Sequence, residues 1–144
     1  MGAAASPGKA YKILLIEDED FLRRIFKSRL VGEGYDVIDV GSAEQALDWL
    51  RETAPDLIIL DLYLPQMNGF DFLKCLKANP ARENVPVLIL SGLGQEADIR
   101  KGLELGAREF VIKTNVKPPE LLNKIRLLLA GKGEGPHPPR GSRP

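Results

Sequence analysis

Four short apolar runs in this sequence end beside residues that can do chemistry. Three carboxylates, one hydroxyl and one ammonium occupy these positions: Glu17, Asp18, Asp61, Ser91 and Lys113. Each of them has an ordinary alternative role, because acids cap helices, serines form turns and lysines at strand ends point into water. Their occurrence together after four separate runs favours a shared site.

Three carboxylates brought within a few ångströms of one another must either take up protons or hold a cation. Oxygen ligands with no cysteine or histidine beside them favour Mg²⁺ or Mn²⁺ over zinc. Magnesium usually binds one or two carboxylates together with phosphate oxygens, so the site suits a phosphoryl group. A carboxylate next to the metal can act as a nucleophile and form an acyl phosphate, while a hydroxyl and an ammonium offset charge on the phosphoryl oxygens.

The elements that must position these residues alternate along the chain. Apolar runs typical of strands cover 12–16, 36–40, 56–60, 85–90 and 109–112. Stretches with helical spacing separate them and predict helices at about 20–32, 42–54, 69–78, 95–105 and 118–129. In the first of these helices, the apolar face is expected to hold Leu22, Ile25, Phe26 and Leu30.

Strands joined by helices run parallel, because the crossover helix returns the chain to the same end of the sheet. The sequence therefore predicts a doubly wound α/β fold. In such sheets, ligands bind beyond the carboxyl ends of the strands, which is where the chemically able residues stand.

Composition limits the class of protein. With 144 residues, of which 44% are hydrophobic, the chain can bury one core and is too short for two domains. Its 20 basic and 20 acidic residues cancel, so no overall field attracts nucleic acid or a membrane surface. The single cysteine, Cys75, fits a reducing cytoplasmic location, and no window reaches the roughly 18 apolar residues of a membrane span.

Both ends of the chain are expected to lie outside the folded part. Residues 1–9 read as a flexible leader, residues 10–130 as one domain, and residues 131–144 as a disordered tail rich in glycine and proline. The only histidine, His137, lies in this tail and is therefore a poor candidate for a catalytic base.

The motifs around the polar residues resemble a known family. Asp61 opens the segment DLYLPQMNG, Ser91 precedes Gly92, and Lys113 closes the segment FVIK. These features are similar to the response-regulator receiver domain of two-component signalling, over about residues 10–130. The resemblance implies a flavodoxin-like fold with five parallel strands in the order 2-1-3-4-5 and five helices. It also implies a signalling switch, whose only catalysis is its own phosphoryl transfer and autodephosphorylation.

The resemblance assigns a role to each carboxylate. Asp61 would accept a phosphoryl group from a phosphohistidine of a histidine kinase or a phosphotransfer protein. Asp18, Asp61 and the backbone carbonyl of Tyr63 would bind Mg²⁺ or Mn²⁺. Glu17, which stands where aspartate is commoner, would act mostly through a water.

The resemblance also implies which residues form the switch and which surfaces bind partner proteins. Ser91 would turn toward the phosphoryl group, Lys113 would pair with it, and Phe110 would change rotamer. The kinase would bind the first helix, where Phe21 and Arg24 are candidates, together with the loop at 64–65. A downstream protein would bind the face formed by the fourth helix, fifth strand and fifth helix, and neither nucleic acid nor a membrane is an expected partner of this domain.

One position departs from the family pattern. Thr114 follows Lys113 where proline is usual, and a cis peptide without proline costs about 2.5–4 kcal/mol, so the geometry of this peptide stays open. With no second domain expected after the tail, the output would come from another protein or from a relay, unless the chain is an excised domain. Tyr63 and Leu93 flank the expected approach of water to Asp61, and neither is suited to position that water, which favours a persistent phosphorylated form.

Two other function classes share some of these features. A phosphatase of the haloacid dehalogenase kind also uses a strand-end aspartate, but it needs a second acid two residues later, where Tyr63 stands. A receiver-like interaction module without phosphate is opposed by the full set of Asp61, Ser91 and Lys113. The segment GLGQEA at 92–97 matches a dinucleotide fingerprint, but it follows the fourth predicted strand, so nucleotide binding is not expected.

Overall fold

The apolar runs form one parallel sheet in the computed structural model, which describes residues 10–132. Its strands lie in the order β2-β1-β3-β4-β5, as predicted. Their bounds are β1 (Lys12–Ile16), β2 (Asp36–Val40), β3 (Leu57–Leu60), β4 (Val87–Ser91) and β5 (Glu109–Ile112). The doubly wound α/β fold is therefore confirmed.

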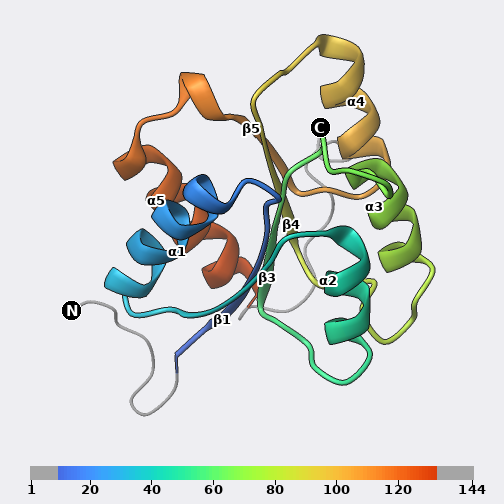
Figure 1. The fold of residues 1–144 in the computed structure, drawn as a ribbon, viewed down its shortest axis with the longest axis horizontal. Helices are drawn as coiled ribbons and strands as arrows, with labels where there is room; N and C mark the ends of the chain where they lie inside the picture. Colours follow the sequence, from blue (N-terminus) through green and yellow to red (C-terminus); the bar gives the residue numbers. More distant parts are fainter. Residues whose placement is uncertain (1–9, 133–144) are drawn as a thin grey trace.

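Helices cover both faces of the sheet (Figure 1). One face carries α1 (Asp20–Gly32) and α5 (Pro118–Lys132). The other face carries α2 (Ala43–Leu50), α3 (Gly69–Lys77) and α4 (Glu96–Glu104). Because the crossovers from β1 to β2 and from β3 to β4 lead to opposite edges, the winding reverses at the carboxyl ends of β1 and β3.

Successive residues of the central strands point to opposite faces, which gives two hydrophobic cores. Leu14 and Leu60 belong to the core on the α2 and α3 side, whereas Leu15 and Ile59 belong to the core on the α1 and α5 side. Full burial of such a side chain contributes about 1.5–3 kcal/mol relative to exposure. The strands that carry the polar residues are thus anchored on both faces, and this explains their nearly continuous apolar sequences.

The observed elements differ from the predicted ones at a few boundaries. Ser91 is the last residue of β4 rather than the residue after it, and α2 ends at Leu50, well before Pro55. The helix α5 continues to Lys132, two residues past the predicted end of the domain. The predicted leader, the rest of the predicted tail and His137 lie outside the described residues.

The peptide bond between Lys113 and Thr114, whose geometry the sequence left open, is trans. Lys113–Asn115 form one short 3₁₀ turn, and every peptide bond in the described part of the chain is trans. Within residues 10–132, no helix has the length and apolar character that crossing a membrane requires.

Candidate functional site

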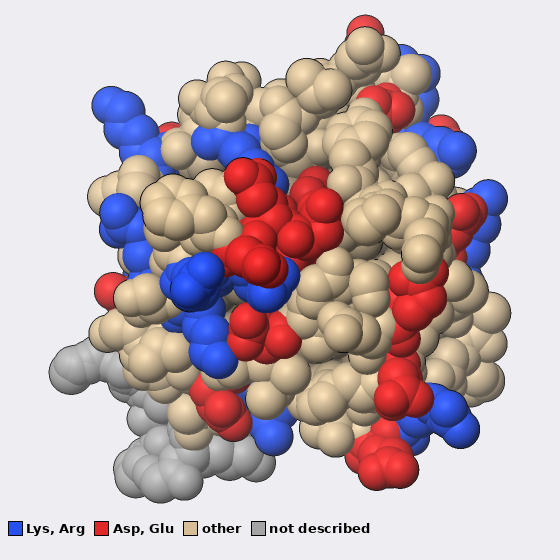
Figure 2. Space-filling view, in the orientation of Figure 1, with Lys and Arg blue, Asp and Glu red and all other residues tan. Residues whose placement is uncertain are grey.

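Three carboxylates meet at the carboxyl edge of the sheet, as the sequence predicts. Glu17, Asp18 and Asp61 each offer an oxygen atom, and these atoms all lie within 4.8 Å of one another. Glu17 is 3% exposed and Asp61 is 8% exposed, whereas Asp18 is exposed to solvent. Figure 2 shows acidic side chains gathered near the middle of this face, with Lys and Arg side chains directly beside them. The donor set consists of oxygen atoms only, which suits a hard divalent cation.

The loop that carries Glu17 is fixed by hydrogen bonds. The Glu17 amide donates to the carbonyl of Val40 at 3.1 Å, and Glu17 Oε2 accepts from the amide of Glu19 at 3.1 Å. Arg23 Nη1 donates to the backbone carbonyl of Glu17 at 2.8 Å. Sequence reasoning did not single out Arg23, which holds the backbone of an acidic residue in the site.

Arg23 is itself held by Asp39 of β2, whose Oδ2 accepts from Arg23 Nε at 3.1 Å. Burial alone would raise the pKa of Asp39, but its hydrogen bonds and charge interactions with Lys27 and Arg23 outweigh burial and lower this pKa. Asp39 therefore stays charged and orients the guanidinium toward the Glu17 loop.

Asp61 follows β3 directly, and its amide donates to the carbonyl of Ile16 at 3.1 Å. Its Oδ1 accepts from the amide of Tyr63 at 3.3 Å. Burial raises the pKa of Asp61, and the charges of Glu17 and Asp18 raise it further, while Lys113 lowers it. The ionised form of Asp61 is thus destabilised by its surroundings, and a bound cation would stabilise it.

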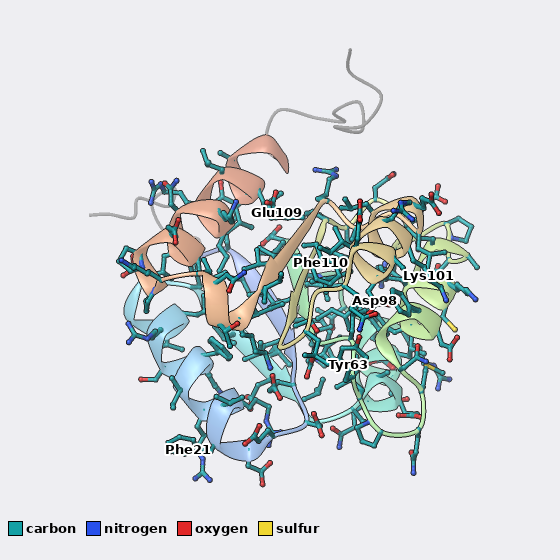
Figure 3. All side chains as sticks on the ribbon, turned by 90° about the horizontal axis from the view of Figure 1, so that it is seen from above. Phe21, Tyr63, Asp98, Lys101, Glu109 and Phe110 are labelled. Atoms are coloured by element: carbon teal, nitrogen blue, oxygen red, sulfur yellow. The ribbon has the colours of Figure 1, made fainter. Side chains whose placement is uncertain are left out.

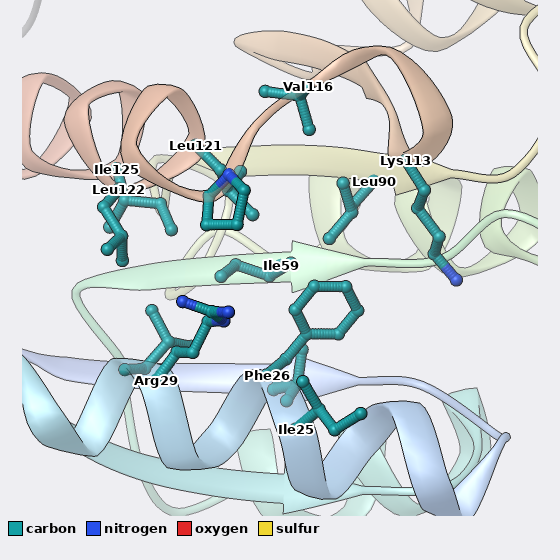
Figure 4. A pocket seen from close by; sticks show the side chains of 13 residues that line it. Ile25, Phe26, Arg29, Ile59, Leu90, Lys113, Val116, Leu121, Leu122 and Ile125 are labelled. Carbon is teal, nitrogen blue, oxygen red and sulfur yellow. The ribbon is translucent and has the colours of Figure 1, made fainter.

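Lys113, which follows the edge strand β5, extends its side chain to the carboxylates. Its Nζ lies 2.7 Å from Glu17 Oε1 and 3.7 Å from Asp61 Oδ2. The stem of this lysine borders a cavity of about 230 Å³ between α1 and α5 (Figure 4). Ile25, expected in the core, is 37% exposed and lines this cavity beside Phe26.

The loop after Asp61 depends on two backbone features. Gly69, the first residue of α3, donates its amide to the carbonyl of Leu62 at 2.8 Å. A Cβ at position 69 would lie 2.8 Å from Leu62 Cα and 2.9 Å from the Asp61 carbonyl oxygen, so only glycine allows this close approach. Gln66 has a φ of 63°, a left-handed backbone conformation that residues other than glycine rarely adopt.

Ser91 and Phe110, the two predicted switch residues, lie in different surroundings. Ser91 is fully buried, and its Oγ accepts from the amide of Leu93 at 3.3 Å. Phe110 is half-buried beside α4 (Figure 3). A Cβ at Gly102 of α4 would lie 2.7 Å from Ile89 Cδ1 and 3.4 Å from Phe110 Cδ2, so the glycine leaves room for Ile89, and the Phe110 ring lies at ordinary contact distance from this point of α4.

Tyr63 contacts α4 through its side chain. Its hydroxyl donates to Asp98 Oδ2 at 2.6 Å. This hydrogen bond, followed by burial, raises the pKa of Tyr63. The contact was not predicted from the sequence.

Of the two glycines of segment 92–97, Gly94 has a packing role, whereas a Cβ at Gly92 would meet no atom within 4 Å. A Cβ at Gly94 would overlap the Ile112 side chain at the end of β5, so the glycine lets this side chain pack against the loop. This contact accounts for Gly94 without a bound dinucleotide.

Comparison with known proteins places this geometry in context. The family model described as the response regulator receiver domain matches residues 13–126. The DNA-binding response regulator MtrA of Mycolicibacterium smegmatis is 38% identical over 125 residues, which are 87% of this chain and 53% of that protein. The chain thus spans about half the length of the curated relatives it matches.

Solved structures give the same result. A CheY-like response regulator receiver domain protein of Methanospirillum hungatei superposes with a TM-score of 0.81 at 26% identity, over 89% of this chain and all of that one. The signal receiver domain of a signal transduction histidine kinase of Syntrophus aciditrophicus superposes with a TM-score of 0.78 at 34% identity, over 85% of this chain and 92% of that one.

Proposed function

Because the chain belongs to the response regulator receiver domain family, we propose that Asp61 is its phosphoacceptor and that phosphorylation there switches a protein-binding surface. The family establishes a signalling domain of two-component systems. The observation that carries the assignment of Asp61 is its position, at the mouth of β3, within 4.8 Å of two further carboxylates and 3.7 Å from the Lys113 ammonium.

The proposed cofactor is Mg²⁺, or Mn²⁺ in its place. Asp18, Asp61 and the carbonyl of Tyr63 would hold it, with Glu17 acting through a water. The site fits such an ion because its donors are oxygens and because burial, together with the neighbouring acids, raises the pKa of Asp61. Mg²⁺ bound there would offset negative charge on the phosphoryl oxygens.

The proposed reaction is one transfer from a phosphohistidine donor. An oxygen of Asp61 attacks phosphorus, and the new O–P bond forms as the P–N bond to the imidazole breaks. The imidazole nitrogen keeps the electron pair of that bond and takes a proton from solvent. The Lys113 ammonium, now beside Glu17 and Asp61, offsets charge on the transferred group, and the Ser91 hydroxyl turns toward it. Later hydrolysis of the acyl phosphate by the domain itself would end the signal.

Receiver domains of response regulators interact with histidine kinases, and we assign the kinase surface here to α1 and the loop at 64–65. Phe21 is 68% exposed on α1, and Arg24 beside it is exposed as well. The output surface is assigned to α4, β5 and α5, since Phe110 lies against α4 and would transmit a change there. We place this signalling in the cytoplasm, with a protein rather than nucleic acid as the direct partner of the domain.

The alternative functions receive less support. A phosphatase of the haloacid dehalogenase kind would need an acid where Tyr63 stands, and the family comparison does not favour it. A module independent of phosphate would not need the Lys113 ammonium beside the buried Asp61 carboxylate. Removing two such charges from water costs free energy, and apolar residues at these positions would avoid that cost.

Phosphotransfer from a labelled phosphohistidine protein tests the proposal. The parent protein and Asp71→Asn, in which an exposed aspartate of α3 is changed, should both take up label in Mg²⁺. Asp61→Asn should take up none, and chelation of the metal should suppress transfer to the parent. Label that persists in Asp61→Asn, or steady turnover of a simple phosphomonoester, would contradict the proposal.

A further inference from the structure

A single hydrogen bond joins the loop after β3 to the helix after β4. The Tyr63 hydroxyl donates to Asp98 Oδ2 at 2.6 Å, and the two side chains lie next to each other in Figure 3. Tyr63 stands two residues after Asp61, and Asp98 stands in the first turn of α4, which follows Ser91. The contact therefore spans the ends of the two neighbouring strands that carry the phosphoacceptor and the buried serine.

Tyr63 is held at both of its ends. Its amide donates to Asp61 Oδ1 at 3.3 Å, while its hydroxyl reaches α4. A tyrosine side chain has two rotatable angles, so a bond at the hydroxyl is enough to fix the ring. A hydrogen bond to a carboxylate is stronger than one between neutral groups. Since the ring is still 49% exposed, it would be free to turn toward solvent without this bond.

The other charged side chains of α4 have different neighbours. Glu96 lies 3.6 Å from Arg100 of the same helix, and Lys101 lies over the ring of Phe70 on α3. Within residues 10–132, Asp98 is the residue of α4 whose side chain is hydrogen-bonded to the loop after β3. One carboxylate therefore carries this link.

We infer that Asp98 is a positioning residue that holds the Tyr63 ring beside Asp61 and so limits the access of water to the phosphorylated aspartate. The inference rests on the proposed phosphorylation of Asp61. Hydrolysis of the acyl phosphate needs a water in line with the Asp61 oxygen. The backbone that carries the Tyr63 ring is hydrogen-bonded to the Asp61 carboxylate, so a ring fixed on α4 stays at the edge of that carboxylate and restricts the approach. Release of the ring, by loss of Asp98 or by a shift of α4, shortens the life of the signal.

The first part of the test needs neither metal nor phosphate. The chain has three tyrosines, so protein with ¹³C-labelled tyrosine rings gives few signals, and Tyr63→Phe identifies those of Tyr63. Asp98→Ala should shift the Tyr63 ring signals, and Asp98→Asn, which keeps an acceptor oxygen, should shift them much less. Glu104→Ala removes an exposed acid from the same helix and should leave them in place. Unchanged Tyr63 signals in Asp98→Ala would overturn the inference.

The second part measures the decay of phosphorylated protein after the donor is removed. Loss of the hydrogen bond that fixes the ring predicts decay about three- to ten-fold faster in Asp98→Ala and in Tyr63→Phe. The double variant should decay no faster than either single variant, and Asp98→Asn should stay close to the parent. Effects that multiply, or an effect of Tyr63→Phe alone, would contradict the role of Asp98. A protein that takes up no phosphoryl group would refute the proposed function, while the tyrosine signals would still decide whether Asp98 holds the ring.

Discussion

Lys113 Nζ lies 2.7 Å from Glu17 Oε1, a contact between residues 96 positions apart in the chain. The two residues follow β5 and β1, which are separated in the sheet by β3 and β4. The Lys113 side chain therefore spans the carboxyl ends of β4 and β3, and its ammonium pairs with a glutamate that is almost fully buried. The Lys113 ammonium thus lies between the carboxylates of Glu17 and Asp61, where a bound cation would add positive charge and a phosphoryl group on Asp61 would add negative charge.

Lys113→Ala should destabilise the metal-free protein by about 1–3 kcal/mol, because buried Glu17 loses the partner of a charged hydrogen bond. Added Mg²⁺ should reduce this difference, since a cation replaces the lost positive charge. Urea unfolding in EDTA and in MgCl₂ measures both effects, and Lys117→Ala, at an exposed position nearby, is the control. A loss that is equal in both conditions would show that the ammonium acts apart from the metal ligands.

Asp61→Asn should stabilise the metal-free protein at neutral pH. Burial first, and then the neighbouring acids, raise the pKa of Asp61 above its ordinary value of 3.8, so the folded protein binds the proton more tightly than the unfolded chain does. The stability contributed by this linkage is present below pH 3.8 and is lost as the pH rises through the folded pKa. Thermal unfolding at several pH values should show a higher midpoint for the variant at pH 7 and a shrinking gap toward pH 4. A variant less stable than the parent at pH 7 would contradict this reading.

Arg23→Ala should weaken Mg²⁺ binding about ten-fold, as expected when a residue that supports a metal ligand is removed. Charge alone predicts the opposite, since loss of a cation near an acidic site favours Mg²⁺. The reason for the weaker binding is the hydrogen bond from Arg23 Nη1 to the Glu17 carbonyl at 2.8 Å. Calorimetric titration compares this variant with Arg24→Ala, which removes the neighbouring exposed charge and should bind Mg²⁺ at least as well as the parent. Equal affinities in the two variants would rule out the support role.

The sheet could be predicted closely because each central strand is nearly all apolar and has a polar residue at its carboxyl end. The bounds expected for β1 and for the two edge strands, 12–16, 36–40 and 109–112, match the structure, whereas those of β3 and β4 differ by one or two residues. The gathering of Glu17, Asp18, Asp61 and Lys113 followed from parallel strands alone, since their carboxyl ends share one edge.

Contacts that depend on side-chain reach could not be predicted in this way. The hydrogen bond from Tyr63 to Asp98 and the one from Arg23 to the Glu17 carbonyl join separate elements, and no spacing in the sequence encodes them. The helical period placed Ile25 on the buried face of α1, but it lines a cavity between α1 and α5 and is partly exposed. The left-handed conformation of Gln66 could not be predicted either, because a positive φ after proline is typical of type II turns, where glycine or asparagine rather than glutamine is expected.

Gln66→Gly should stabilise the protein by up to about 1 kcal/mol, because glycine adopts a φ of 63° without the steric cost that glutamine bears. Gln66→Ala is the matched control, since it removes the same side chain but keeps the Cβ, and it should bring no gain. Chemical unfolding at fixed Mg²⁺ concentration measures the difference. Equal stability of the two variants would mean that the turn is not strained at this position.

Intact mass after incubation with acetyl phosphate tests the central claim most directly. With Mg²⁺, the parent protein should gain a single phosphoryl group, about 80 Da, and with EDTA it should gain none. Asp61→Asn should stay at its unmodified mass in both conditions, while Asp71→Asn should behave as the parent does. An increase of the same mass in Asp61→Asn would contradict the assignment of Asp61 as the phosphoacceptor of this receiver domain.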